Sequence, residues 1–231
     1  MRKGKERVLI RAFIMKVSMC LIVSGLMMQS AAAHPHSWID MKADMILDDS
    51  GRLTAIRQLW YFDAYFSTVT LADAISEHGD KEVGLQKMAD QFVVNLSSFQ
   101  YFSELTIGGA EIELPRPSSY QLVEDPHQNQ SILILEMLFD ITPAPLVSDK
   151  NMLWSVFDPT YYIAMNYTEV ENVSIKSAAG THCVSNLDVP NPSFELVEYA
   201  QNLDRTRKDT DGLGVNFAEK VQISCSADTP Q

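Results

Sequence analysis

The sequence predicts a mainly β, α+β domain, with an antiparallel β-sandwich-like body and a helical insertion after its first hairpin. Apolar and polar residues alternate with a period of two near the start, and short strand-like segments recur in the second half. Between these regions, apolar residues recur every three or four positions over residues 85–99, without a proline. We therefore expect one domain over residues 34–231, with the insertion at about residues 68–102.

Residues 1–33 have the pattern of a cleavable secretory signal. A basic start is followed by an apolar segment over about residues 12–28, and Ala31 and Ala33 fit the peptidase subsites before a cut. A retained membrane anchor is the alternative, but the apolar run is short for a full span. The mature chain is therefore expected to begin at His34 in the bacterial periplasm, reaching the membrane only through a partner.

The first hairpin and the helices follow from changes in periodicity. Residues 39–47 alternate strictly, residues 48–51 supply a turn, and residues 53–62 form the second expected strand. A short helix is expected over about residues 70–77, capped by Thr68 or Thr70 and stopped by Gly79. The amphipathic helix over residues 85–99 follows it.

Further strands are expected in short pieces separated by turn residues. They are residues 105–107, 111–113, 120–123, 132–141, 154–157, 161–167, 173–176 and 215–225. Residues 186–214 contain Pro190, Pro192 and many charges, so they predict a long loop.

The chain is acidic, with a formal net charge of −12 that becomes −17 once residues 1–33, which carry a net +5, are removed. Nucleic acid is a poor partner for such a surface, because binding to phosphate requires Lys and Arg. The charge suits cations, although a well-solvated surface explains most of it.

The expected mature chain keeps two cysteines, Cys183 and Cys225. Two cysteines in an oxidising compartment usually form a disulfide. The alternatives are a reactive cysteine pair and a soft metal site, but the sequence lacks the Cys-x-x-Cys spacing and the Cys/His cluster that these require. A disulfide between them would close a loop of 42 residues, which is worth roughly 3 to 4 kcal/mol in the chain-entropy model.

The tripeptide His34-Pro35-His36 predicts a transition-metal site. Cleavage would give His34 a free α-amino group beside its imidazole, and His36 can add a third nitrogen. Pro35 has no N–H, so the square-planar site that uses deprotonated backbone amides is disfavoured. A frayed terminus with two ordinary surface histidines is the alternative.

Two carboxylates could complete that site. Asp63 follows the aromatic run at residues 60–62, and Asp158 stands before Pro159 near the end of an expected strand. Each has a structural alternative, because Asp63 can cap the next helix and Asp158 can form a turn. The sequence lacks the common nucleophile, phosphate-loop and zinc-protease motifs, so we expect no enzyme. A copper enzyme with an N-terminal histidine brace remains a weaker possibility.

Four motifs, in order along nearly the whole expected mature chain, resemble a family of periplasmic proteins described as a component of an uncharacterised transport system. That family includes ZevA-like zinc, nickel and cobalt uptake accessory proteins. The motifs are residues 34–40 (HPHSWID), 60–67 (WYFDAYFS), 157–161 (FDPTY) and 217–219 (FAE) before Cys225.

The resemblance implies a non-enzymatic accessory to an inner-membrane permease for divalent metal. The resemblance does not settle which ion, and we expect zinc before nickel, cobalt or copper. The alternative is a structural or interaction domain of the envelope, in which the histidines are incidental.

Overall fold

The computed structural model describes residues 35–125, 131–176, 181–203 and 212–227. The expected signal and His34 lie outside the described residues. No helix in these ranges is both long enough and apolar enough to cross a membrane.

The first sheet is built around one long strand, β1. In order, it contains β5 (Ser119–Glu124), β6 (Leu133–Asp140), β2 (Leu53–Phe62), β1 (Ser37–Leu47) and β8 (Ile163–Asn166), and β9 (Val173–Lys176) also pairs with β1. Antiparallel pairing joins β1 to β2, as expected for the first hairpin, whereas β8 and β9 run parallel to β1. Ile39, Met41, Ala43 and Met45 alternate toward the core, which confirms the predicted half-buried strand.

The second sheet contains the cysteine pair. In order, it consists of β10 (Thr181–Asp188), β11 (Lys220–Ala227), β7 (Asn151–Val156), β3 (Ser103–Ile107) and β4 (Ala110–Glu111). Cys183 and Cys225 are directly opposite each other on β10 and β11 and form the predicted disulfide. The five named strands of this sheet pair antiparallel with one another, which agrees with the predicted class.

The two sheets share one hydrophobic core. Trp154 and Tyr167 are among its largest fully buried side chains. A buried polar link joins the sheets, because Gln58 Nε2 on β2 donates a hydrogen bond of 2.9 Å to Ser103 Oγ on β3. Gln58 Oε1 in turn accepts from Trp60 Nε1 at 2.9 Å. Satisfied buried hydrogen bonds of this kind fix how two apolar layers align.

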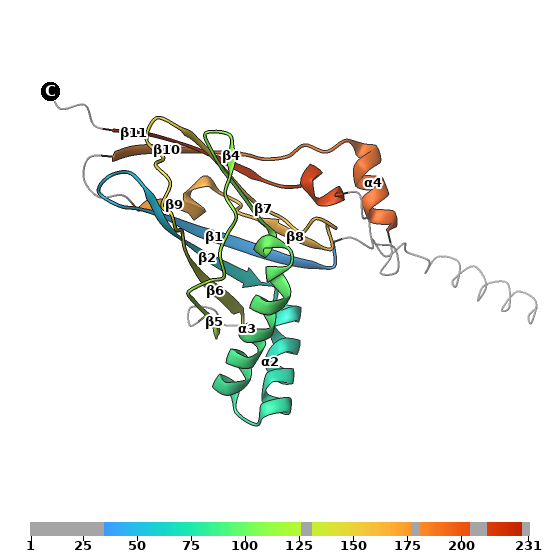
Figure 1. Cartoon of the computed structure of the whole chain (residues 1–231). Coiled ribbons are helices and arrows are strands. Elements are labelled where there is room, and N and C mark those ends of the chain that lie inside the picture. The colour runs from blue at the N-terminus through green and yellow to red at the C-terminus, as the bar shows by residue number, and fades with distance from the viewer. Residues whose placement is uncertain (1–34, 126–130, 177–180, 204–211, 228–231) are drawn as a thin grey trace, which may run out of the picture. The chain divides into compact units, whose positions relative to one another are not determined.

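The helical insertion follows β2 directly and extends beyond the sheets in Figure 1, as α2 (Ala64–His78), α3 (Lys81–Ser97) and the 3-10 turn η1 (Gln100–Phe102). The expected start was wrong by several residues, because Asp63 rather than Thr68 or Thr70 caps α2. Gly79 ends this helix in the left-handed conformation, with φ 72°, as expected. The insertion therefore begins without any loop after the strand.

The turn η1 has an uncommon backbone. Gln100, Tyr101 and Phe102 have φ angles of 51°, 54° and 57°, a left-handed run with no glycine in it. Such conformations cost roughly 1 to 3 kcal/mol per residue and persist only when surrounding contacts enforce them. Here Tyr101 is buried in the core, and the Phe102 carbonyl accepts a hydrogen bond from Phe157 N.

The expected loop over residues 186–214 was wrong in part. Its beginning belongs to β10, and it contains α4 (Phe194–Asn202) and the first residues of the 3-10 turn η3 (Leu213–Asn216). Ser193 caps α4 by accepting a hydrogen bond from Leu196 N.

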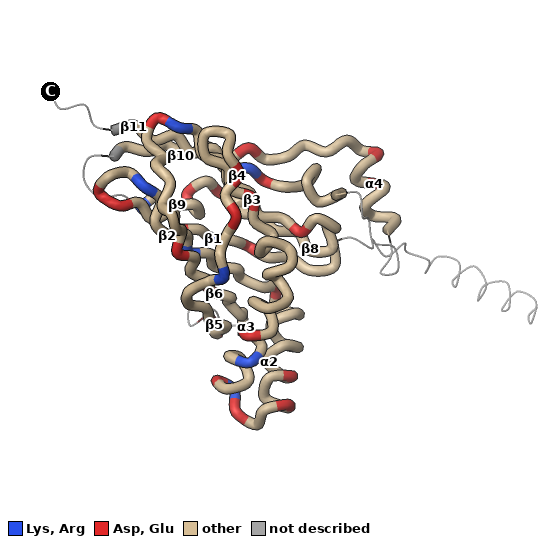
Figure 2. The backbone as a smooth tube through the Cα atoms, in the orientation of Figure 1, with Lys and Arg blue, Asp and Glu red and all other residues tan. Residues whose placement is uncertain are grey.

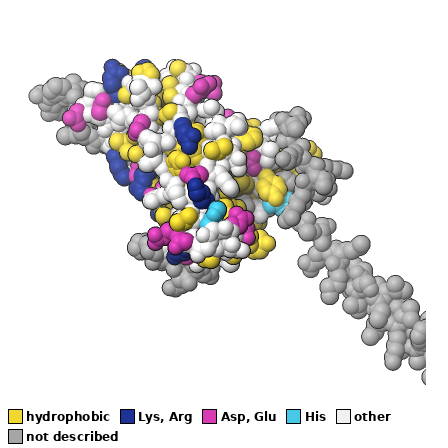
Figure 3. Space-filling view, turned by 60° about the horizontal axis from the view of Figure 1, so that its bottom comes forward, with side chains coloured by type: hydrophobic (Ala, Val, Ile, Leu, Met, Phe, Trp, Pro, Cys, Tyr) yellow, Lys and Arg dark blue, Asp and Glu magenta, His cyan; other side chains and the backbone are white. Residues whose placement is uncertain are grey.

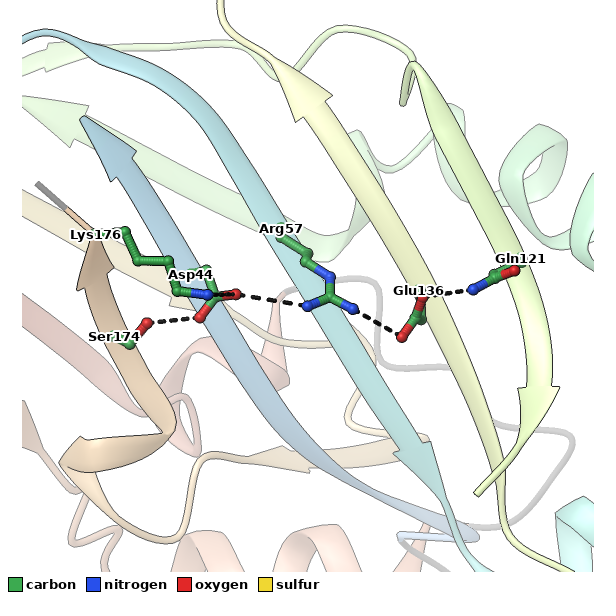
Figure 4. A network of polar contacts seen from close by, with 6 residues as sticks. All are labelled: Asp44, Arg57, Gln121, Glu136, Ser174 and Lys176. Carbon is green, nitrogen blue, oxygen red and sulfur yellow. Dashed lines mark hydrogen bonds and ion pairs between the residues drawn. The ribbon is translucent and has the colours of Figure 1, made fainter. Parts of the chain in front are cut away.

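The outer face of the first sheet carries a polar network across five strands (Figure 4). Arg57 on β2 pairs with Glu136 at 3.0 Å and with Asp44 at 3.8 Å. Asp44 also accepts hydrogen bonds from Lys176 and Ser174 on β9, each at 2.6 Å. Partial burial raises the pKa of Asp44, but these partners outweigh it and lower the pKa overall. Acidic positions also occur over both sheets and the helical hairpin (Figure 2).

Candidate functional site

An apolar cavity of about 410 Å³ lies where the first sheet meets the helical insertion. Its walls come from segments that are far apart in the sequence: the start of β1, the end of β2, both helices, η1, β6 and the start of β8. The volume is within the range of small-ligand and side-chain pockets. The insertion therefore forms one wall of a pocket whose other walls are the sheet.

Aromatic rings dominate this cavity. Phe62 stacks on Phe66 with ring centroids 4.7 Å apart, and Phe92 lies about 6 Å from both. Trp60 stacks on Phe102 at 6.2 Å, so the left-handed turn supplies one ring of the wall. Rings packed against one another present a stiff apolar surface.

His36 lies at the edge of the cavity, just before β1. Its backbone N–H donates a hydrogen bond of 2.8 Å to the carbonyl of Tyr162, and its ring lies 4.6 Å from the Tyr162 ring. The side chain is half-buried, and its Nε2 atom is buried. Figure 3 shows hydrophobic side chains interspersed with charged ones on the described surface. The structure thus holds His36 in place rather than in a frayed end.

Asp63 is the second predicted residue at this cavity. Its Oδ1 accepts from Phe66 N at 2.8 Å, and its Oδ2 accepts from Ser37 Oγ at 2.7 Å and from Trp38 N at 3.2 Å. Partial burial raises the pKa of Asp63, but the hydrogen bonds outweigh it and lower the pKa overall. Asp63 therefore carries a negative charge at neutral pH beside the first residues of β1.

An acidic cleft of about 720 Å³ adjoins the apolar cavity, because Phe62 and Asp63 line both. Four acidic residues, Asp40, Asp63, Asp125 and Glu169, line this cleft. Lys42 also lines it, with its Nζ 5.3 Å from the centre of the Tyr61 ring. The two hollows together present an apolar surface next to a mainly negative one.

Asp158 has a structural role in the described chain. It is 6% exposed, its Oδ1 accepts from both N and Oγ1 of Thr160, and its Oδ2 accepts from Ile163 N at 3.0 Å. These bonds shape the turn that brings Tyr162 to His36. Asp158 thus forms a turn, which was the structural alternative offered by the sequence. It acts on the site indirectly, by positioning Tyr162.

The four predicted residues differ in what the structure shows of them. His36 and Asp63 line the same cavity. Asp158 does not line it but accepts a hydrogen bond from Ile163, which does, and His34 lies outside the described residues. Within the described ranges, no group of three or more His, Cys, Asp or Glu side chains is placed to hold a metal ion. A metal site with three nitrogen ligands and one carboxylate would therefore need His34 in addition to His36 and Asp63.

Sequence reasoning missed the aromatic cavity itself. The rings Trp60, Phe62 and Phe66 belong to a motif that was noted, but Phe92 and Phe102 come from other elements. The aromatic density of residues 60–66 was the available signal.

Comparisons of the sequence with known proteins identify the family of this chain. Residues 19–225 match the family described as "Protein of unknown function (DUF1007)". An uncharacterised protein of Haemophilus influenzae is 33% identical over 198 residues, covering 84% of this chain and 91% of that protein. No solved structure matches.

Proposed function

The chain belongs to the DUF1007 family of proteins of unknown function, and we propose that it is a periplasmic accessory protein that binds a divalent transition metal and supports its transport through an inner-membrane permease. The observation that carries the proposal is the placement of His36 and Asp63 at one cavity. His36 lies only two residues after the expected mature N-terminus, His34. We propose no enzymatic step.

The donor set supports a transition metal rather than calcium. The proposed ligands are the α-amine and imidazole of His34, the imidazole of His36 and the carboxylate of Asp63. Nitrogen donors favour zinc, nickel, cobalt and copper, whereas calcium requires six to eight oxygens. Zinc takes three protein nitrogens and one carboxylate oxygen readily in a tetrahedral site. We therefore place zinc first.

The surroundings suit a carrier. Carboxylates in the adjoining cleft raise the local concentration of cations. A site with two ligands on a chain terminus can open without unfolding the domain, which favours release to a permease. The Cys183–Cys225 disulfide supports an oxidising compartment such as the periplasm.

Native mass spectrometry of protein exported to the periplasm tests the proposal. It reports both the N-terminal residue and the metal stoichiometry during titration with zinc, nickel, cobalt and copper. We expect a chain that begins at His34 and takes up one ion. The double variant His34→Ala and His36→Ala should lose this ion, whereas His78→Ala and His182→Ala, away from the cavity, should keep it.

A second variant separates the N-terminal chelate from the imidazoles. One alanine inserted before His34 moves the α-amine away and leaves both side chains in place. We expect zinc affinity to fall at least tenfold in this variant, with an unchanged circular dichroism spectrum. Equal zinc affinity in the inserted and double variants and the parent protein would refute the N-terminal site and favour the interaction-domain reading.

A further inference from the structure

We propose that the apolar cavity and the acidic cleft together form a docking site for an extended peptide segment of a partner protein, with one large apolar side chain next to a basic residue. The site would take the apolar side chain in the cavity and the cation in the cleft. This inference does not require a bound metal ion, so it stands apart from the proposed function.

The first argument is the exposure of aromatic rings around the hollows. Tyr65 is 82% exposed, Trp38 is 53% exposed and Tyr162 is 39% exposed, and each lines the cavity or the cleft. Large aromatic side chains left in water cost free energy unless a partner covers them, and Trp and Tyr are enriched at the centres of protein interfaces. A rim of this kind favours a peptide or protein over a small molecule that would be enclosed by the cavity alone.

The second argument is charge complementarity. The cavity offers rings, whereas the cleft beside it offers the carboxylates of Asp40 and Glu169, with Asp63 between the two. A cation that enters the cleft would be attracted by several acidic residues and, among the described lining residues, repelled by Lys42 alone. A peptide with an apolar side chain but no neighbouring basic residue would gain no electrostatic attraction from the cleft.

The third argument is distance along the partner. Because Phe62 and Asp63 line both hollows, the cavity and the cleft meet at these residues. An extended peptide advances about 3.3 to 3.6 Å per residue, so two residues reach about 7 Å across these shared residues. The expected motif is a Phe, Tyr, Trp, Leu or Ile within two positions of a Lys or Arg.

The cavity is also stiff enough to select a side chain. Phe102 reaches the wall from the left-handed turn at residues 100–102, and Trp60 is held by its hydrogen bond to buried Gln58. A preformed apolar pocket spends little ordering energy on binding.

The test uses the mature protein in EDTA, so that loss of metal binding and loss of peptide binding are measured separately. A random twelve-residue peptide library displayed on phage is selected against it, and enriched peptides are synthesised for fluorescence anisotropy. We expect enrichment of an aromatic or large aliphatic residue within two positions of Lys or Arg. Their affinity should fall as the salt concentration rises.

Variants locate the binding. Tyr65→Ala should weaken these peptides at least tenfold, and the pair Asp40→Asn with Glu169→Gln should weaken them and reduce their salt dependence. The matched controls are Phe194→Ala, which removes a 75% exposed ring on α4, and Glu104→Gln on β3. Neither control should change the affinity.

Three results would overturn the inference. The first is a library that enriches no apolar-basic motif. The second is unchanged affinity in Tyr65→Ala. The third is binding of the apolar dye anilinonaphthalene sulfonate, or of a second copy of the chain, in a Tyr65-dependent manner while no peptide binds.

Discussion

Replacing Asp63 separates two roles that its carboxylate combines. In Asp63→Ala, α2 loses its N-cap and both Ser37 Oγ and Trp38 N lose an acceptor. In Asp63→Asn, the amide oxygen can still accept from Phe66 N, because Asn is as good an N-cap as Asp. Its NH₂ group would then face the N–H of Trp38, donor against donor.

The magnitudes follow from these contacts. Loss of a cap costs about 1 kcal/mol. Each of the other two hydrogen bonds adds about 0.5 kcal/mol at a half-buried position. We expect Asp63→Ala to lower the free energy of unfolding by about 2 kcal/mol, and Asp63→Asn by about 0.5 to 1 kcal/mol. The first change corresponds to a fall in Tm of roughly 4 to 8 °C for a domain of this size.

Urea unfolding followed by circular dichroism measures both variants, under conditions that keep the disulfide intact. The pKa of Asp63 is lowered in the folded state, so the stability that its charge contributes is present at neutral pH. That contribution is lost as the pH falls below the ordinary value of 3.8, through the folded pKa. The gap between the parent and Asp63→Asn should therefore close in acid. Equal losses in the Asn and Ala variants at pH 7, or a gap that widens in acid, would refute the capping argument.

Three further predictions concern the frame around the site. Asp44→Asn should destabilise the protein by about 1 kcal/mol at pH 7, with the difference shrinking as the pH falls below 3.8 through the lowered pKa, as acid unfolding curves would show. Replacing both Cys183 and Cys225 with Ser should lower the free energy of urea unfolding by about 3 to 4 kcal/mol, whereas adding reductant to that variant should change nothing. Gly84→Ala should destabilise the helical hairpin despite the better helix propensity of alanine, because the added Cβ would clash with the Ala74 carbonyl oxygen. A rise in Tm would contradict this packing.

The strands with clear alternation could be predicted from sequence. In β1, every second residue from Ile39 to Met45 faces the core, and this period is visible in the letters alone. β10 was missed because its inward-facing positions are only half-buried and include the polar Ser185, whereas the apolar Val184 is exposed, so the residue types do not follow the alternation of the strand. α4 was hidden by Pro190 and Pro192, although Ser193 as a cap was the available signal.

The candidate site was predictable only in part. His36 and Asp63 were chosen separately, and the structure brings them to one cavity through the hydrogen bonds of Ser37 and Trp38 to Asp63. The rings of the cavity could not be assembled from sequence, because they come together only when the helical insertion folds back on the sheet. The left-handed backbone of residues 100–102 could not be predicted from the sequence, because none of these residues is glycine.

The position of β1 has a practical consequence for protein engineering. The described chain enters this strand beside the cavity, whereas β11 ends at the opposite end of the sheets (Figure 1). Under the proposed function, an affinity tag or fluorescent fusion at the expected mature amino end would replace the α-amine two residues before His36, so such a protein would give a false negative in the metal assay. A fusion after residue 231 leaves that end untouched, and reporters for this protein belong at its carboxyl end.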